Sequence, residues 1–149
     1  MSRSSESNVI LLAEDDADDR MLVKRVLENE LGVTDVRTVW NGEDLMEYLR
    51  RKGAYASPEE APRPALILLD LNMPRKDGRE ALTEIKSDPE LRSIPVIVLT
   101  TSNSENDVEQ SYLAGVNAYV TKPARFSEMV EAFRRLHDFW FGVVRLPGR

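Results

Sequence analysis

One aspartate at the end of an uncharged apolar run constrains this chain more than any other feature. Residues 65–69 read Ala-Leu-Ile-Leu-Leu, and Asp70 follows them directly. Five consecutive apolar residues indicate a strand that is buried on both faces, as in a parallel sheet. Because a bare buried carboxylate is costly, Asp70 is expected at the rim of the sheet, beside partners that stabilise its charge.

Other short apolar segments predict four further strands, at residues 9–13, 33–39, 95–99 and within 116–121. Between the strands, apolar residues recur at helical spacing, and a long last helix is expected with Ser127 as its cap. Residues 50–64 contain three prolines and one glycine, which predicts a long surface loop. Strands that alternate with helices predict an α/β domain with a parallel sheet between two helical layers.

The composition excludes several classes of protein and site. The 149 residues include no cysteine and one histidine, which rules out disulfide frameworks, thiolate sites and multi-histidine zinc sites. The net charge of −6 argues against a nucleic-acid partner. No segment approaches the roughly 18 apolar residues of a membrane span, and no signal peptide is evident, so a cytoplasmic protein without a membrane partner is expected.

Polar residues directly follow four of the predicted strands. Glu14 and Asp15 follow the first, Asp70 the third, Thr100 the fourth and Lys122 the fifth. Ligands of open parallel sheets bind outside these carboxyl ends. Clustered carboxylates repel one another, and a hard cation such as Mg²⁺ relieves the repulsion through oxygen ligands. Lys122 and Thr100 suit a phosphoryl group, so a carboxylate nucleophile that forms an aspartyl phosphate is predicted.

These residues, in this order, resemble the receiver domain of bacterial two-component response regulators. The resemblance rests on Glu14-Asp15, on residues 70–78 (Asp-Leu-Asn-Met-Pro-Arg-Lys-Asp-Gly), on Thr100 and on Lys122-Pro123. It implies a flavodoxin-like (βα)5 fold with strand order 2-1-3-4-5. It also implies a phosphoacceptor in a phosphorelay that signals through a changed surface and is not an enzyme in the turnover sense.

The resemblance assigns the acceptor and the metal ligands. Asp70 accepts a phosphoryl group from a phosphohistidine of a partner sensor histidine kinase. Asp15 and Asp70 are expected to bind Mg²⁺ directly, Glu14 through water, and Asn72 through its backbone carbonyl. The position of Asn72 also tunes self-dephosphorylation in this family.

The resemblance further assigns a switch. Lys122 and Thr100 are expected to contact phosphoryl oxygens, and Tyr119 to turn inward as Thr100 engages. Ser102 occupies a second position that tunes self-dephosphorylation in the family. A cis peptide bond is expected between Lys122 and Pro123, since X-Pro bonds adopt it at modest cost.

The end of the chain carries more aromatic surface than one helix face can bury. Phe139, Trp140 and Phe141 are consecutive there. Exposed apolar clusters of this kind mark interfaces. With the long loop and no output domain, the chain resembles single-domain regulators paired with cyanobacterial and bacterial phytochromes. This implies a receiver domain at residues 8–137, an extension at 138–149 that helps form a homodimer, and a light-regulated kinase, such as a bacteriophytochrome, as donor.

Two other functions compete with this interpretation. A metal-dependent phosphatase or phosphotransferase with an aspartyl intermediate normally needs a second carboxylate two residues after the nucleophile, where this chain has Asn72. A nucleotide- or flavin-binding module needs a glycine-rich loop after the first strand, where this chain has Glu14-Asp15-Asp16-Ala17.

Each feature also has a purely structural interpretation. The acids after the first strand could be a solvated loop, Asp70 a strand-end cap, and Lys122-Pro123 a structural pair. Tyr119 could be a packed aromatic, and the aromatic tail could fold back as core. His137 has no partner pattern, which favours a surface position over a phosphorylation site. The joint occurrence of the strand-end residues favours the phosphoacceptor.

Overall fold

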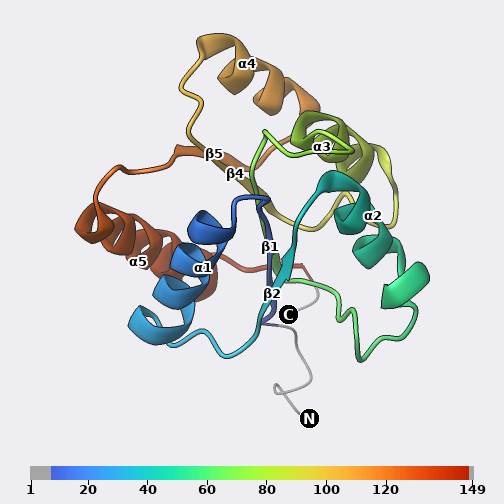
Figure 1. The fold of residues 1–149 in the computed structure, drawn as a ribbon, viewed down its shortest axis with the longest axis horizontal. Coiled ribbons are helices and arrows are strands. Elements are labelled where there is room, and N and C mark those ends of the chain that lie inside the picture. The colour runs from blue at the N-terminus through green and yellow to red at the C-terminus, as the bar shows by residue number, and fades with distance from the viewer. Residues whose placement is uncertain (1–7, 148–149) are drawn as a thin grey trace.

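The computed structural model describes residues 8–147 and contains one sheet of five parallel strands (Figure 1). The strand order is β2-β1-β3-β4-β5, which confirms the predicted topology. The strands are short and consist of β1 Ile10–Ala13, β2 Val36–Val39, β3 Leu66–Leu69, β4 Val96–Thr100 and β5 Ala118–Thr121. The three central strands, β1, β3 and β4, are buried throughout, as their uninterrupted apolar sequences predict.

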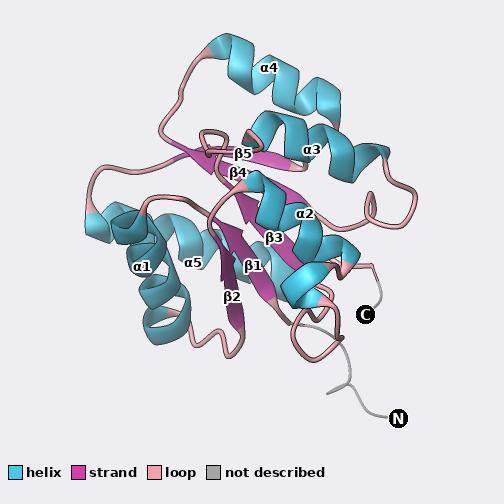
Figure 2. Cartoon of the chain, turned by 45° about the vertical axis from the view of Figure 1, so that its right-hand side comes forward, coloured by secondary structure: helices cyan, strands magenta, loops and turns pink. Residues whose placement is uncertain are grey.

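Helices cover both faces of the sheet, as Figure 2 shows. They comprise α1 Ala17–Arg25, α2 Gly42–Arg50, α3 Gly78–Ser87, α4 Glu105–Ala114 and α5 Phe126–Gly142, with a π-helical turn, η2 Val26–Glu30, that continues α1. Alternate residues of β1 point to opposite faces. Leu11 joins a core cluster with α2 and α3, whereas Leu12 joins a cluster with α1 and α5. Within residues 8–147, no helix combines the length and apolar character that crossing a bilayer requires.

Local sequence signals account for most helix ends. Asp16, Asn41, Asp77 and Ser104 each precede a helix and accept a hydrogen bond from a backbone N–H of its first turn. Gly115 ends α4 with φ +107°, as expected for a glycine in this position.

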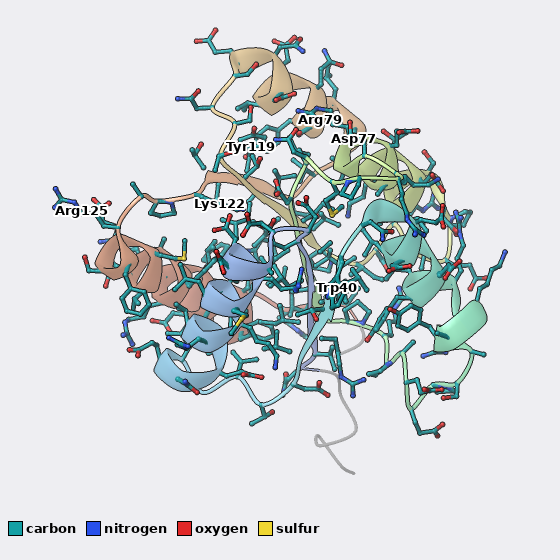
Figure 3. All side chains as sticks on the ribbon, viewed as in Figure 1. Trp40, Asp77, Arg79, Tyr119, Lys122 and Arg125 are labelled. Atoms are coloured by element: carbon teal, nitrogen blue, oxygen red, sulfur yellow. The ribbon has the colours of Figure 1, made fainter. Side chains whose placement is uncertain are left out.

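The expected cap of the last helix is wrong. The residue at the N-cap of α5 is Arg125, which makes no side-chain capping bond, and the helix begins at Phe126. Ser127 is therefore already the second residue of the helix, two positions too late to cap it. Arg125 is labelled at this helix start in Figure 3.

The segment 50–64 is largely an exposed connection, as predicted, but it is not structureless. It contains a 3-10 turn, η3 Gly53–Tyr55, and Ala61 is buried. The hydroxyl of Tyr48 in α2 donates to the carbonyl oxygen of Pro62 at 2.8 Å. These contacts hold the connection against the amino end of the sheet, so it leaves the carboxyl end free.

Candidate functional site

Three carboxylates converge at the carboxyl end of the sheet. Glu14 and Asp15 follow β1, and Asp70 follows β3; ligand oxygens of all three lie within 4.8 Å of one another. The parallel register explains this, because Ala13 pairs with Leu69 and the two strands end at the same level. Glu14 and Asp70 are buried, whereas Asp15 is exposed.

Lys122, labelled in Figure 3, follows the end of β5 and reaches this acidic cluster. Its Nζ lies 2.5 Å from Glu14 Oε1, 3.0 Å from Asp19 Oδ2 and 3.6 Å from Asp70 Oδ2. Only 7% of its side chain is exposed. Glu14 and Lys122 are 108 positions apart in the sequence, so the fold assembles this cluster from distant segments of the chain.

Burial dominates the electrostatics of this cluster. Burial raises the pKa of Glu14 to about 7, and the charge of Asp70 adds to the rise, although the hydrogen bond from Lys122 opposes it. Burial by itself would lower the pKa of Lys122, but hydrogen bonds to Glu14 and Asp19 raise it above its ordinary value. The cluster thus holds more acidic groups than one ammonium neutralises.

Asp19 was missed at the level of sequence. It lies in the first turn of α1, where an acid is expected simply to favour the helix dipole. Its partner Lys122 is 103 residues away, so only the folded chain reveals the ion pair.

Arg20 holds the acidic loop from the other side. Its Nη1 donates to the carbonyl oxygens of Glu14 at 2.9 Å and Asp15 at 3.3 Å. The guanidinium also lies 4.4 Å from the ring centroid of Trp40, at the end of β2. The backbone that presents two of the carboxylates is therefore anchored by a side chain that sequence analysis did not identify.

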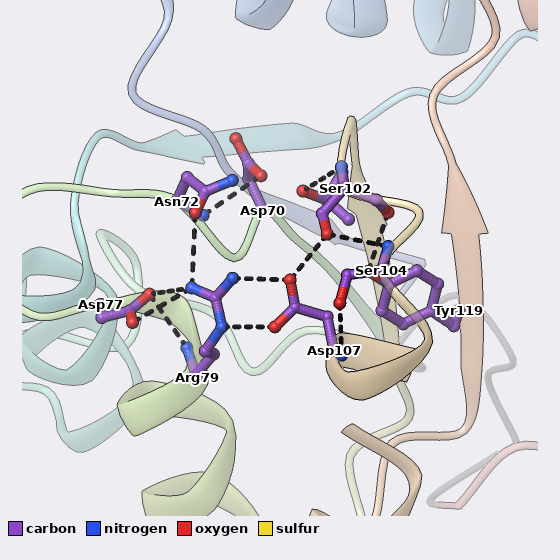
Figure 4. Close-up of polar contacts among 9 residues, drawn as sticks. Asp70, Asn72, Asp77, Arg79, Ser102, Ser104, Asp107 and Tyr119 are labelled. Atoms are coloured by element: carbon purple, nitrogen blue, oxygen red, sulfur yellow. Dashed lines mark hydrogen bonds and ion pairs between the residues drawn. The ribbon is translucent and has the colours of Figure 1, made fainter. Parts of the chain in front are cut away.

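Of the predicted switch residues, Thr100 is the last residue of β4 and Tyr119 is the second residue of β5. Thr100 is fully buried, and its Oγ1 accepts a hydrogen bond from Ser102 N at 3.4 Å. The Tyr119 hydroxyl donates to the carbonyl oxygen of Ser102 at 2.9 Å (Figure 4). Tyr119 is thus partly packed against the core and also bonded to the loop that follows Thr100.

A bidentate ion pair beside the site was also missed. Arg79 donates from Nε and Nη2 to the two carboxylate oxygens of Asp107, both at 2.9 Å. Hydrogen bonds from Arg79 and Ser102 lower the pKa of Asp107 to about 2. The two partners begin different helices, α3 and α4, so no local sequence pattern points to them.

Two details concern the residues next to the cluster. The Asn72 side chain is engaged outside the cluster, since its Oδ1 accepts from Arg79 Nη1 at 3.3 Å. The predicted cis bond between Lys122 and Pro123 is wrong, because residues 8–147 contain no cis peptide bond. The trans form is intrinsically favoured even before proline, and Lys122 reaches the acids with it.

The three consecutive aromatics of the tail differ in burial. Phe139 is 49% exposed, whereas Trp140 and Phe141 pack in part against the core on the α1 side of the sheet. Leu146, beyond α5, is buried. Part of the extension therefore folds back, and residues 148 and 149 lie outside the described part of the chain.

Comparison with protein families decides what this arrangement is. Residues 10–134 match the model of the response regulator receiver domain. The chain belongs to the receiver domain family. It is 45% identical over 147 residues to the response regulator Rcp1 of Synechocystis, covering 97% of this chain and 98% of Rcp1.

Solved receiver structures have the same architecture. The phosphorylated cyanobacterial phytochrome response regulator RcpA matches with a TM-score of 0.87 and 46% identity, over 94% of this chain and 98% of that one. The Mn²⁺-bound form of Rcp1 matches with a TM-score of 0.82 and 44% identity, over 95% of this chain and 99% of that one. The chain is thus a signalling receiver domain with the flavodoxin-like fold.

The donor set of the acidic cluster fits a hard divalent cation. Carboxylate oxygens are the ligands such ions prefer, and the described residues Glu14, Asp15 and Asp70 offer one each within a common 4.8 Å. Burial raises the pKa of Glu14 and the charge of Asp70 adds to the rise, so a cation bound beside these acids would favour the ionised carboxylate.

Proposed function

We propose that Asp70 of this receiver domain accepts a phosphoryl group from a phosphohistidine of a sensor histidine kinase. The observation that carries the proposal is the convergence of Glu14, Asp15 and Lys122 on Asp70 at the end of the sheet. The side chain of Asp70 is 9% exposed, so a small part of it is accessible to a donor.

In the transfer, a carboxylate oxygen of Asp70 forms a bond to phosphorus as the P–N bond of the phosphohistidine breaks. The electron pair of that bond stays on the imidazole nitrogen of the donor. Lys122, 3.6 Å from Asp70 Oδ2, is placed to pair with a phosphoryl oxygen. The hydroxyl of Thr100 would donate to another oxygen, after giving up the bond that it accepts from Ser102.

Mg²⁺ is proposed as the cofactor. Asp15 and Asp70 would bind it directly, Glu14 through water, and Asn72 through its backbone carbonyl. When bound, the ion supplies positive charge to the oxygens of the phosphoryl group. The residues of the chain then orient the acceptor and sense the product.

The phosphorylated form signals through its surface. A phosphoryl group adds a charge of about −1.5 to −2 next to Thr100. Tyr119 is bonded to the loop that follows Thr100, so a shift of this loop changes the surface around β5 and α4. The protein is therefore proposed to act as a cytoplasmic switch whose only chemistry is self-catalysed transfer and slow self-dephosphorylation.

A phytochrome-type sensor kinase is the proposed donor. The support is the similarity over 94% of the chain to RcpA, which is a phytochrome response regulator. Incubation with a phosphorylated bacteriophytochrome kinase should move the label to Asp70 within minutes, whereas an unrelated histidine kinase should transfer it far more slowly. Equal rates with both donors would contradict this choice of partner.

A homodimer is proposed that is built on α4, β5 and the C-terminal extension. Phe139 and Val143 of the extension are 49% and 72% exposed, and on α4 Leu113 is 74% exposed. Exposed apolar side chains of this size favour an interface. Light scattering should give twice the monomer mass for the full chain and the monomer mass for Phe139→Glu; a monomeric wild-type protein would contradict the proposal.

The decisive experiment is phosphorylation by acetyl phosphate in the presence of Mg²⁺. The intact protein should gain one phosphoryl mass, and Asp70→Asn should gain none. Asp18→Asn, an exposed acid of α1 with the same change of charge, is the matched control and should be labelled like the wild type. Equal labelling of Asp70→Asn would show that the acceptor is another residue.

The competing enzymatic function is tested with the same protein. A phosphatase with an aspartyl intermediate would hydrolyse many equivalents of a small phosphate ester. The position two residues after Asp70 is occupied by Asn72, whose side chain is bonded to Arg79 and carries no acidic proton. Multiple turnovers would contradict the proposed signalling role.

A further inference from the structure

A chain of polar contacts crosses the edge of the site from the β3–α3 loop to β5 (Figure 4). At its centre, the guanidinium of Arg79 forms the bidentate ion pair with Asp107, and its Nη1 donates to Asn72 Oδ1. Ser102 Oγ donates to Asp107 Oδ2 at 2.6 Å, and Tyr119 donates to the carbonyl oxygen of Ser102. Among these residues, the Arg79–Asp107 pair is therefore the side-chain contact that joins the loop after β3, which carries Asn72, to the loop after β4, which carries Ser102.

Both ends of this chain are bonded to residues of the proposed transfer. Asn72 lies two positions after Asp70, and its N–H donates to Asp70 Oδ1 at 3.4 Å. Ser102 lies two positions after Thr100, and its N–H donates to Thr100 Oγ1 at 3.4 Å. The ion pair thus connects the loop of the acceptor to the loop of the switch threonine.

The same contacts restrain the segment that follows β4, which carries Ser102. A hydroxyl has one proton to donate, and that of Ser102 points at Asp107. If Thr100 turns toward a new phosphoryl oxygen, its bond from Ser102 N breaks and the segment after β4 must shift. The Ser102–Asp107 bond opposes this shift, because Asp107 is itself held by two bonds from Arg79.

We propose that Arg79 and Asp107 are positioning residues that hold Ser102 and Asn72 in the unphosphorylated arrangement and so oppose capture of a phosphoryl group at Asp70. This inference rests on the proposed function of Asp70. Neither residue is a catalytic residue, since each acts on the site through a neighbour. Their removal should favour the phosphoryl-bound state, because it destabilises the unphosphorylated arrangement.

The geometry of the pair predicts which replacement is tolerated. Arg79 presents a planar fork that matches the carboxylate of Asp107, whose side chain is only 15% exposed. A lysine keeps the positive charge but not two parallel bonds. Arg79→Lys should therefore lie between the wild type and Arg79→Gln, whereas a general requirement for positive charge would make Arg79→Lys equal to the wild type.

The test uses beryllofluoride, a phosphoryl mimic, titrated with Mg²⁺ in excess and followed by calorimetry. Arg79→Gln and Asp107→Asn should each bind it about fivefold more tightly than the wild type, the scale expected for one partly exposed ion pair. The double variant should gain no more than Arg79→Gln alone, because Arg79→Gln already removes the contact with Asp107 as well as those with Asn72 and Asp77. In the unbound variants, the backbone amide resonance of Ser102 should move toward its position in the bound wild type.

Arg50→Gln is the matched control. Arg50 bridges α2 and α3 through Glu84 and Asp88, and its side chain is 36% exposed against 39% for Arg79. Its loss should leave beryllofluoride affinity unchanged. Should a variant of the ion pair fail to fold, Ser102→Ala provides a second route, since it removes the bond to Asp107, leaves the ion pair intact and should also tighten binding.

The outcomes distinguish the positioning role of the ion pair from the proposed function of Asp70. Wild-type protein that binds beryllofluoride, with unchanged or weaker binding in both Arg79→Gln and Asp107→Asn, would overturn the positioning role alone. An equal gain in Arg50→Gln would overturn it too, because a distant ion pair would then suffice. Wild-type protein that neither binds beryllofluoride nor is labelled at Asp70 would contradict the proposed function, and the positioning role with it.

Discussion

Two partly buried lysines at opposite ends of the sheet have opposite electrostatic surroundings. Lys122, beyond the carboxyl end of β5, lies among the carboxylates of Glu14, Asp19 and Asp70. Lys86, in the last turn of α3, lies near the amino end of β4 and donates to three neutral oxygens. These are the carbonyls of Arg92 at 3.1 Å and Ile94 at 2.8 Å, and Asn117 Oδ1 at 3.1 Å.

The pKa values of the two ammonium groups move in opposite directions. Burial lowers the pKa of Lys86, and no acid compensates for it. Burial acts on Lys122 in the same sense, but its hydrogen bonds to Glu14 and Asp19 outweigh it and raise the pKa. The comparison teaches that Lys86 ties a loop to the sheet, whereas Lys122 belongs to a cluster in which the acidic groups outnumber the ammonium group.

Removing each lysine in turn tests this distinction most strongly. Lys122→Met should slow labelling by acetyl phosphate by about 100-fold or more, because the phosphoryl group loses a fixed positive charge. Lys86→Met should label at nearly the wild-type rate but cost about 2 kcal/mol of unfolding free energy, since the carbonyls of Arg92 and buried Ile94 lose their donor. Labelling kinetics and urea denaturation provide the two measurements.

Two results would contradict this distinction between the lysines. A large loss of labelling in Lys86→Met, with a normal free energy of unfolding, would assign that lysine to the site. Normal labelling in Lys122→Met would remove the functional argument for the acidic cluster.

The carboxyl end also depends on close approach of the backbone, which a glycine tests. A Cβ at Gly78 would overlap the carbonyl oxygen of Asp70 and lie 2.7 Å from Leu71 Cα. Gly78→Ala should therefore cost about 2 kcal/mol of unfolding free energy and slow labelling as well, since the acceptor loop must move. Both are measured on the same preparation by urea denaturation and acetyl phosphate labelling.

Gly142→Ala is the control for this substitution. Gly142 is the last residue of α5, and a Cβ there meets no atom within 4 Å. Alanine should leave labelling unchanged and slightly increase stability, because glycine is unfavourable in a helix. A labelling defect in this variant, or none in Gly78→Ala, would contradict the role given to close packing at the acceptor loop.

At the amino end of the sheet, Tyr48 makes a contact whose contribution to stability depends on pH. Its side chain is buried and donates to Pro62, and burial raises its pKa to about 12, above the value near 10 of an unfolded chain. The resulting stability is fully present below pH 10 and is lost as pH rises toward 12. Tyr48→Phe should lower the free energy of unfolding by about 1 kcal/mol at pH 7. Above pH 10, the free energy of unfolding of this variant should decline less steeply than that of the wild type.

Urea denaturation between pH 7 and 11 measures this dependence. Tyr112→Phe is the matched control, because Tyr112 is 50% exposed and should leave the pH profile unchanged. An unchanged profile in Tyr48→Phe would show that another group causes the alkaline loss. Neither variant should alter labelling, which keeps the two ends of the sheet distinct.

Sequence patterns predicted which strands and helices form better than they predicted where each one begins and ends. The second strand was expected at residues 33–39, but β2 contains only Val36–Val39. The reason is local competition, since the N–H of Val33 donates to the carbonyl of Leu27 at 2.9 Å and so closes the preceding turn instead. The aromatic tail was expected to be an interface, yet Trp140 and Phe141 also find partial cover against the core.

The amino-acid order alone determined that Glu14, Asp15, Asp70 and Lys122 follow strands and that Thr100 lies at the end of one. In a parallel sheet these positions share one edge, so their convergence follows from connectivity. Only the tertiary structure decided which charges pair. Asp19 meets Lys122, and Arg79 meets Asp107, across separations of 103 and 28 residues, because distant helix ends pack beside the same edge. Burial, which no local pattern encodes, then determined the raised pKa of Glu14.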